Sequence, residues 1–227
     1  MGSITLRLLT WNLKHGRSVP SSGRDLLDEF ARALAGWSWD VALLQEAPPW
    51  WPALLGARLG ASARLVLTSR NELLPLRRAI AERWPDVIKS GGGGSNAILV
   101  RSAKIVEHRT LRLALLPERR QLQAVRLEPG IWIGNLHATA HNARAAASEA
   151  ERGAATILQW AAAAPAVLGG DFNLRSFELS GFARAASHDV DHLFVAGLQV
   201  SAGAEVFDRG TLSDHAPVAV AVAVASR

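Results

Sequence analysis

The stretch Ala166–Leu174 constrains the fold of this chain most. Three apolar residues lead into a Gly-Gly pair, and Asp171 and Asn173 follow at once. A short apolar run followed by a turn signal is typical of a buried strand, and residues two apart on a strand point to the same side. We therefore expect the carboxylate and the carboxamide to leave the strand end together. The two glycines would let the backbone bend and let another group approach closely.

Two interpretations of this stretch are open at the level of its residues. A carboxylate in this position can bind a metal ion or take a proton from water, and the carboxamide can donate a hydrogen bond to an anionic oxygen. The same residue types also form Asx turns at the ends of strands. The rest of the chain decides between a functional site and a turn.

Apolar segments of strand length recur along the chain and alternate with helical patterns. Besides the stretch above, we expect strands at residues 4–11, 40–44, 62–68, 96–100, 106–115, 122–127, 131–136, 190–195, 198–206 and 216–225. We expect a helix that begins near 21–23, a short helix or turn at 50–59, and helices at 72–84 and 143–163, the last with Asn142 as its N-cap. This mixture predicts an α/β fold in which two sheets pack face to face with helices outside, in one domain over residues 1–227.

A glycine-rich run interrupts the pattern at residues 90–95, which read Ser-Gly-Gly-Gly-Gly-Ser. Such a run is typical of a flexible linker and could mark a domain boundary. A strand is expected immediately after it, and matching strands lie on both sides. We therefore interpret the run as a loop within one domain.

The composition limits the partners and cofactors. The chain has no cysteine, so a bound metal would use carboxylates, imidazoles, amides and water, which favours hard ions such as Mg2+ or Mn2+. The net charge of +5 is carried almost wholly by arginine, whose guanidinium binds phosphate bidentately, although a GC-rich genome explains such a composition equally well. No apolar run approaches the ~20 residues of a membrane span, and the N-terminus lacks a signal-peptide pattern. We expect a soluble, cytoplasmic protein, with a monomer as the default.

Several carboxylate, carboxamide and imidazole side chains have the same position in the sequence pattern: each stands at the end or the start of an apolar strand. These residues are Asn12, Glu46, His137, Asp171, Asn173, Asp191, His192, Asp214 and His215. Each alone has a plain structural explanation, since strands often end in Asn or Asp. Together, strand ends at one edge of a sheet sandwich would form one polar pocket on a rigid floor.

The motifs at these strand ends carry a family resemblance. They read Thr-Trp-Asn-Leu at 10–13, Leu-Gln-Glu at 44–46, Gly-Asn-Leu-His at 134–137, Gly-Asp-Phe-Asn at 170–173, Val-Asp-His at 190–192 and Leu-Ser-Asp-His-Ala-Pro-Val at 212–218. In this order, from residue 4 to about 222, the chain resembles the endonuclease/exonuclease/phosphatase family. The resemblance implies a four-layer α/β/β/α sandwich of two mixed sheets, and Mg2+-dependent phosphoester hydrolysis with Mn2+ as a substitute.

The resemblance also implies roles for the strand-end residues. A cation would be held by Glu46 and Asn12 with Asp214 nearby, and the substrate phosphate would be bound by Asn12, Asn173, His137, His215 and Arg120. The reaction itself would depend on Asp171, His215, His137, Asp191 and Asn173. Asp191 would orient His215, and the proton of the attacking water could go to Asp171 or to a histidine.

Several departures and alternatives remain. The chain has no tyrosine, so it resembles the branch of the family that places a histidine, here His137, at the phosphate. Arg119 or Arg120 could contact phosphate, or both could be solvated hairpin charges. Lys14 and His15 follow Asn12 closely and could line the rim of the pocket, although a solvated loop is the favoured interpretation, and neither His108 nor His141 has ligand spacing. The leading function is a nuclease or other phosphodiesterase acting on nucleic acid. A small-molecule or lipid-headgroup phosphoesterase and an inactive phosphate-binding module are the alternatives.

Overall fold

Four strands buried on both faces make up the centre of the computed structural model, which describes residues 5–68, 71–88, 94–128 and 130–224. They are β1 (Thr5–Asn12), β2 (Val41–Ala47), β7 (Ile131–His137) and β8 (Ala166–Asp171). Their nearly continuous apolar sequences suit strands covered by another sheet on one side and by a helix on the other.

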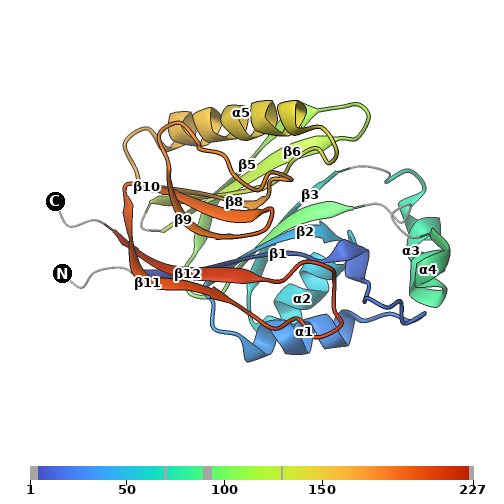
Figure 1. The fold of residues 1–227 in the computed structure, drawn as a ribbon. Coiled ribbons are helices and arrows are strands. Elements are labelled where there is room, and N and C mark those ends of the chain that lie inside the picture. Colours follow the sequence, from blue (N-terminus) through green and yellow to red (C-terminus); the bar gives the residue numbers. More distant parts are fainter. Residues whose placement is uncertain (1–4, 69–70, 89–93, 129, 225–227) are drawn as a thin grey trace.

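These strands belong to two six-stranded mixed sheets that pack face to face (Figure 1). The first sheet has the order β11 (Leu198–Val206), β12 (Val218–Val224), β1, β2, β4 (Ser95–Val100) and β3 (Ser62–Leu67). The second has the order β5 (Ile105–Ala114), β6 (Arg120–Leu127), β7, β8, β10 (Asp191–Ala196) and β9 (Ala183–His188). The expected meander appears as the antiparallel neighbours β5, β6 and β7.

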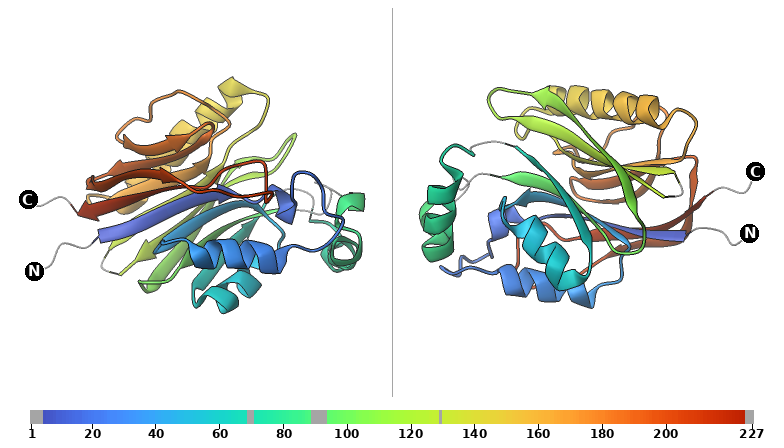
Figure 2. Two further views of the ribbon diagram at one scale, coloured as in Figure 1. Left: turned by 60° about the horizontal axis from the view of Figure 1, so that its bottom comes forward. Right: turned by 180° about the vertical axis from the view of Figure 1, so that it is seen from behind.

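Helices cover the outer face of each sheet, as the views from below and behind also show (Figure 2). The first sheet is covered by α1 (Leu27–Gly36) and α2 (Trp51–Leu59), and the second by α5 (Ala143–Ala161). Asn142 caps α5 by accepting a hydrogen bond from the N–H of Ala145 at 3.0 Å. The short helices α3 (Leu74–Arg83) and α4 (Pro85–Ile88) lie at one end, and the 3-10 turn η1 (Lys14–Gly16) follows β1. The α/β sandwich expected from the sequence is confirmed.

The core has an aliphatic middle and two aromatic flanks. Between the sheets, buried Leu, Ile and Val residues such as Leu43 and Ile133 interdigitate. Trp11 and Phe30 pack together beneath the first sheet, with ring centroids 4.9 Å apart. Truncating a buried side chain of this core to alanine would lower the free energy of unfolding by ~2–5 kcal/mol.

One parallel strand pair stands in each sheet. The pair β1–β2 brings Asn12 level with Gln45, and the pair β7–β8 brings His137 level with Asp171. The other neighbours in both sheets are antiparallel. Carboxyl ends of parallel strands meet at one sheet edge, so each pair delivers polar residues together.

A buried polar bridge joins the two sheets close behind these ends. The Gln45 side chain donates to Oδ1 of Asn135 at 2.8 Å, and Asn135 in turn donates to the carbonyls of Leu44 and Ala97 at 3.0 and 2.9 Å. Both side chains are fully buried. Because a buried amide must keep its partners, the bridge fixes the position of β2 against β7.

The predicted elements match the observed ones with shifts of a few residues at their ends. β2 continues through Ala47, beyond the predicted end of the strand, and the edge strand β9 was not predicted. The glycine-rich run lies outside the described residues up to residue 93, whereas Gly94 is described and Ser95 begins β4. Among the described helices, none has both the length and the apolar character of a membrane span.

Candidate active site

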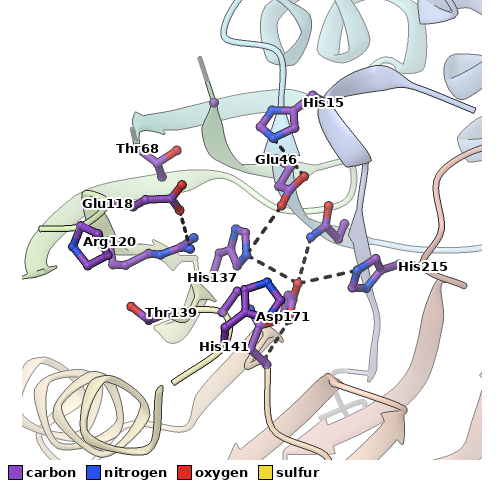
Figure 3. Close-up of a pocket in the computed structure, with 15 residues that line it drawn as sticks. His15, Glu46, Thr68, Glu118, Arg120, His137, Thr139, His141, Asp171 and His215 are labelled. Carbon is purple, nitrogen blue, oxygen red and sulfur yellow. Dashed lines mark hydrogen bonds and ion pairs between the residues drawn. The ribbon is translucent and has the colours of Figure 1, made fainter. Parts of the chain in front are cut away.

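A pocket of ≈ 420 Å³ opens where the carboxyl ends of the two parallel pairs meet (Figure 3). It brings together seven of the nine residues with predicted roles. These are Asn12, Glu46, Arg120, His137, Asp171, Asn173 and His215. Asp191 lies behind His215, and Asp214 lies at the rim. The pocket is also lined by His15, Thr68, Gly94, Pro117, Glu118, Thr139, Ala140 and His141.

Asp171 is the hub of the pocket, at the end of β8. Its Oδ2 accepts a hydrogen bond from Nδ2 of Asn12 at 2.9 Å, and its Oδ1 accepts one from the N–H of Asn173 at 2.9 Å. The residue is only 2% exposed. Burial raises the pKa of Asp171, although the charge of His215 and these hydrogen bonds oppose the shift. The result is a fixed carboxylate with more basic character than one in water.

The two carboxamides are held in set orientations. Oδ1 of Asn12 accepts a hydrogen bond from the N–H of Lys14 at 2.9 Å, which leaves its nitrogen for Asp171. Asn173 adopts a left-handed φ of 52° and donates from Nδ2 to the carbonyl of Ala138 at 3.0 Å. Asparagine tolerates that conformation better than most residues, so the turn after Asp171 suits the sequence Asp-Phe-Asn.

His215 forms a buried pair with Asp191. The distance from Nδ1 of His215 to Oδ2 of Asp191 is 2.7 Å, and Asp191 is 1% exposed. Burial alone would lower the pKa of His215, but its hydrogen bond to Asp191 and the nearby carboxylates raise it to about 9. Burial raises the pKa of Asp191 to about 7 against that same hydrogen bond. At neutral pH His215 is therefore held as an imidazolium whose Nε2 lies 3.9 Å from Oδ2 of Asp171.

His137 has the opposite electrostatic character. Its Nε2 lies 3.6 Å from Oδ2 of Asp171 and 3.8 Å from Oε1 of Glu46. Burial first, and then the charges of Arg120 and the neighbouring histidines, hold the pKa of His137 well below its ordinary value. The pocket thus presents one neutral and one charged imidazole on either side of Asp171.

Glu46 projects into the pocket from an irregular part of β2. The register between β2 and β4 shifts between Leu44 and Ala47, and Glu46 itself has a φ of 49°. Such bulges re-aim side chains next to functional sites. The carboxylate consequently stands between His15, at 3.1 Å, and His137.

Arg120 and Asp214 are placed differently from one another. Arg120 is 5% exposed, lines the pocket and pairs with Glu118 at 2.7 Å, so it is not a solvated hairpin charge. Asp214 is half-exposed, pairs with Lys14 and lies 4.0 Å from Nε2 of His215. The structure brings Asp214 to the rim rather than into the lining.

The Gly-Gly pair serves packing of the protein itself. A Cβ on Gly170, which has a φ of 141°, would lie 1.8 Å from the carbonyl oxygen of Leu136. A Cβ on Gly169 would meet the side chains of Leu193 and Leu43 at 2.5 and 2.7 Å. The close approach predicted from the sequence is present, but strand β7 and two leucines make it.

Candidate metal ligands lie in two parts of the site. Asp171, Asp191 and His215 form the one group in the described parts of the chain whose three ligand atoms lie within 4.8 Å of one another. That group already pairs internally, and Asp191 does not line the pocket. Glu46 and Asn12 line it directly, so a cation held by them would face a bound substrate.

Sequence reasoning missed part of the lining. For His15 a solvated loop was favoured over a place at the pocket rim, but it contacts Glu46 because the left-handed turn after β1 directs it inward. His141 and Thr139 enter the lining from the segment between β7 and α5. The closeness of Lys-His-Gly to Asn12 was the available signal for His15, and no spacing marks the other two.

Comparisons with known proteins agree with this geometry. A model described as "Endonuclease/Exonuclease/phosphatase family" matches residues 9–215. Among solved structures, the endonuclease/exonuclease/phosphatase from Bacteroides vulgatus is 15% identical with a TM-score of 0.73, over 98% of this chain and 100% of that chain. TDP2 from C. elegans is 16% identical with a TM-score of 0.68, over 97% of this chain and 75% of that chain. The mannosyl-6-phosphatase Bt3783 of Bacteroides thetaiotaomicron VPI-5482 is 17% identical with a TM-score of 0.67, over 96% and 99%. A search of curated sequences found no match.

Proposed function

Because this chain belongs to the endonuclease/exonuclease/phosphatase family, we propose that it is a Mg2+-dependent phosphoester hydrolase that cleaves nucleic-acid phosphodiesters by attack of water. The observation that carries the proposal is the arrangement around Asp171. One buried carboxylate receives hydrogen bonds from Asn12 and Asn173 and faces two imidazoles of different protonation. Hydrolysis of an anionic ester requires such a set, since water must lose a proton while negative charge builds on the phosphate.

The donor set fits a divalent cation. Glu46 brings a carboxylate to the pocket, and oxygen ligands are those that Mg2+ and Mn2+ prefer. The amide oxygen of Asn12, which already accepts the N–H of Lys14, would be the second ligand through its other lone pair. Asp214 is the third proposed ligand and would have to part from Lys14 to contribute. The cation, when bound, supplies positive charge to the phosphate oxygens and to the leaving oxygen.

Three side chains of the pocket have separate proposed roles in the reaction. Asp171 orients the attacking water and accepts its proton at a carboxylate whose pKa is raised by burial. His215, kept as an imidazolium by Asp191, donates a hydrogen bond from Nε2 to a phosphate oxygen. His137 binds the phosphate from the opposite side as a neutral imidazole, with Arg120 beyond it.

Asn173 and Asn12 fix the orientation of the Asp171 carboxylate toward the position proposed for the phosphate. The N–H of Asn173 and the amide of Asn12 occupy both oxygens of the carboxylate, which prevents it from rotating. Such fixed positioning supplies a large part of the rate of an enzyme, because the reacting groups are not reorganised during the step.

We favour nucleic acid as the substrate class because the chain is rich in arginine and carries a net charge of +5. A small phosphoester is the second candidate, favoured by the pocket volume of ≈ 420 Å³, which lies within the range of small-molecule sites. Glu118 in the lining also favours a compact ligand with hydroxyl groups over a polyanion.

A panel of phosphoesters tests the proposal. Hydrolysis of plasmid DNA, single-stranded DNA, RNA, bis-p-nitrophenyl phosphate and phosphomonoesters is measured with Mg2+ at two salt concentrations. We expect cleavage of a nucleic acid whose affinity falls steeply as salt rises. Turnover of monoesters alone, with a flat salt response, would favour the second candidate, and no turnover of any phosphoester would contradict both.

A further inference from the structure

The imidazole of His15 contacts Glu46 inside the pocket, and none of the roles above uses it (Figure 3). Its Nε2 lies 3.1 Å from Oε2 of Glu46, while the other carboxylate oxygen faces His137 at 3.8 Å. The His15 side chain is 17% exposed, so it is largely inside the molecule. A mostly buried imidazole against the predicted cation ligand is a feature that the proposed reaction leaves unexplained.

The backbone holds His15 in this place. Lys14, His15 and Gly16 have consecutive positive φ angles of 48°, 53° and 74°. Gly16 donates its N–H to Leu13 at 2.8 Å, and a Cβ on Gly16 would lie 2.4 Å from the Trp51 ring. Two non-glycine residues in the left-handed region are unfavourable, so the surrounding structure must maintain the turn.

We propose that His15 and Glu46 bind the divalent cation together, one through nitrogen and one through oxygen, so that the proposed Mg2+ site also binds a first-row transition ion, with higher affinity than Mg2+. The proposal rests on the cation role of Glu46 proposed above. Metal–ligand bonds of about 2.1 Å at a right angle separate two ligand atoms by about 3.0 Å. The 3.1 Å between Nε2 and Oε2 is therefore close to the separation of two neighbouring ligands of one ion.

The chemistry of the ligands gives the selectivity. Mg2+ takes oxygen ligands and keeps several waters, whereas first-row transition ions accept imidazole nitrogen readily. A site built only from the oxygens of Glu46 and Asn12 would discriminate weakly between Mg2+ and a transition ion. One nitrogen ligand raises the affinity for the transition ion relative to that for Mg2+. His15 thus determines which metal loads the enzyme rather than how the phosphate is attacked.

Binding of Mn2+ to the whole protein, without substrate, tests the proposal. Pulsed electron paramagnetic resonance of the wild type is expected to show coupling of the bound Mn2+ to a 14N nucleus, and His15→Gln is expected to abolish it. The Mn2+ affinity of His15→Gln should fall by about tenfold or more while the Mg2+ affinity changes less than about threefold. His141→Ala, which removes another imidazole of the lining, is the control and should retain the coupling.

The variants separate the alternatives. Gln preserves a hydrogen-bond donor. If His15 only orients Glu46, the ratio of the Mn2+ affinity to the Mg2+ affinity will be the same in His15→Gln as in the wild type, and this result would overturn the proposal. Coupling that survives in His15→Gln but disappears in His137→Gln would also overturn it. His15→Asn, with a residue that tolerates positive φ, repeats the test if His15→Gln does not fold. Binding of Mn2+ without nitrogen coupling refutes this inference alone, whereas absence of any Mn2+ binding refutes the proposed cation site as well.

Discussion

Nδ2 of Asn12 lies 2.9 Å from Oδ2 of Asp171, and this hydrogen bond joins the end of β1 in one sheet to the end of β8 in the other. The two residues are 159 positions apart in the sequence. Neither sheet alone contains a complete site, because Asn12 and Glu46 come from the first sheet and His137 and Asp171 from the second.

Replacing Asp171 with Asn should abolish most hydrolysis and leave the fold intact. Loss of a group that accepts the proton of water lowers kcat by about 10²- to 10⁴-fold. Steady-state kinetics and circular dichroism check the two parts. Asp28→Asn is a matched control, because that aspartate is exposed on α1 and pairs with Arg58, and near-normal turnover of Asp171→Asn would refute the assignment.

Replacing Asp191 with Asn should lower the pKa of His215. The wild-type value is raised to about 9, above the ordinary value of 6.5, so charged His215 stabilises the fold fully below about pH 6.5 and loses this contribution as pH rises through 9. The pKa of Asp191, raised by burial to about 7, opposes part of this gain, because the buried carboxyl loses stability as it ionises. We expect a contribution on the order of 1–3 kcal/mol at neutral pH. NMR titration of the imidazole and urea unfolding at several pH values, both in metal-free protein, measure it. An unchanged His215 titration in Asp191→Asn would contradict the pairing.

Gly170→Ala should destabilise the protein strongly. The added Cβ would overlap the carbonyl oxygen of Leu136 and would sit on a backbone with a φ of 141°, so β7 and β8 would have to separate. We expect a loss of more than about 3 kcal/mol, or failure to fold. Gly203→Ala is the control, since nothing lies within 4 Å of its Cβ position. Equal stability of the two variants in denaturant titrations would show that the strands tolerate the clash.

Asn135→Leu should reduce activity beyond its effect on stability. It removes the bridge to Gln45 and leaves the carbonyls of Leu44 and Ala97 without this partner, at a cost of about 1–3 kcal/mol. Glu46 and His137, each within two residues of the bridge, would then lose their fixed separation. Asn142→Ala removes the N-cap of α5 and costs about 1 kcal/mol away from the site, so it controls for stability alone. Equal kcat in the two variants would argue against a positioning role.

Chelation of divalent ions should remove activity reversibly. EDTA is expected to stop hydrolysis, and Mg2+ or Mn2+ in excess should restore it, because without a cation the Glu46 carboxylate would place a second negative charge beside the phosphate. Turnover is measured before chelation, after chelation and after dialysis into each ion. Full activity in the chelator would refute the metal role.

The sequence predicts the strands of both sheets and the strand-end residues well, because buried central strands are long apolar runs with abrupt polar ends. The placement of Asn12 beside Asp171 follows from family motifs, since no local pattern encodes a contact across 159 positions. His15 was missed because three successive left-handed residues have no marker besides Gly16. The edge strand β9 was missed because its sequence alternates poorly, with Ala186 as its buried residue.

The bridge between Gln45 and Asn135 and the bond between Asn12 and Asp171 place the whole site across the boundary between two layers. A chain in which one sheet alone has formed would therefore hold only part of the residues that the proposed reaction needs. On the proposed function, hydrolysis would require both layers to be docked, so the activity would report on complete assembly of the sandwich.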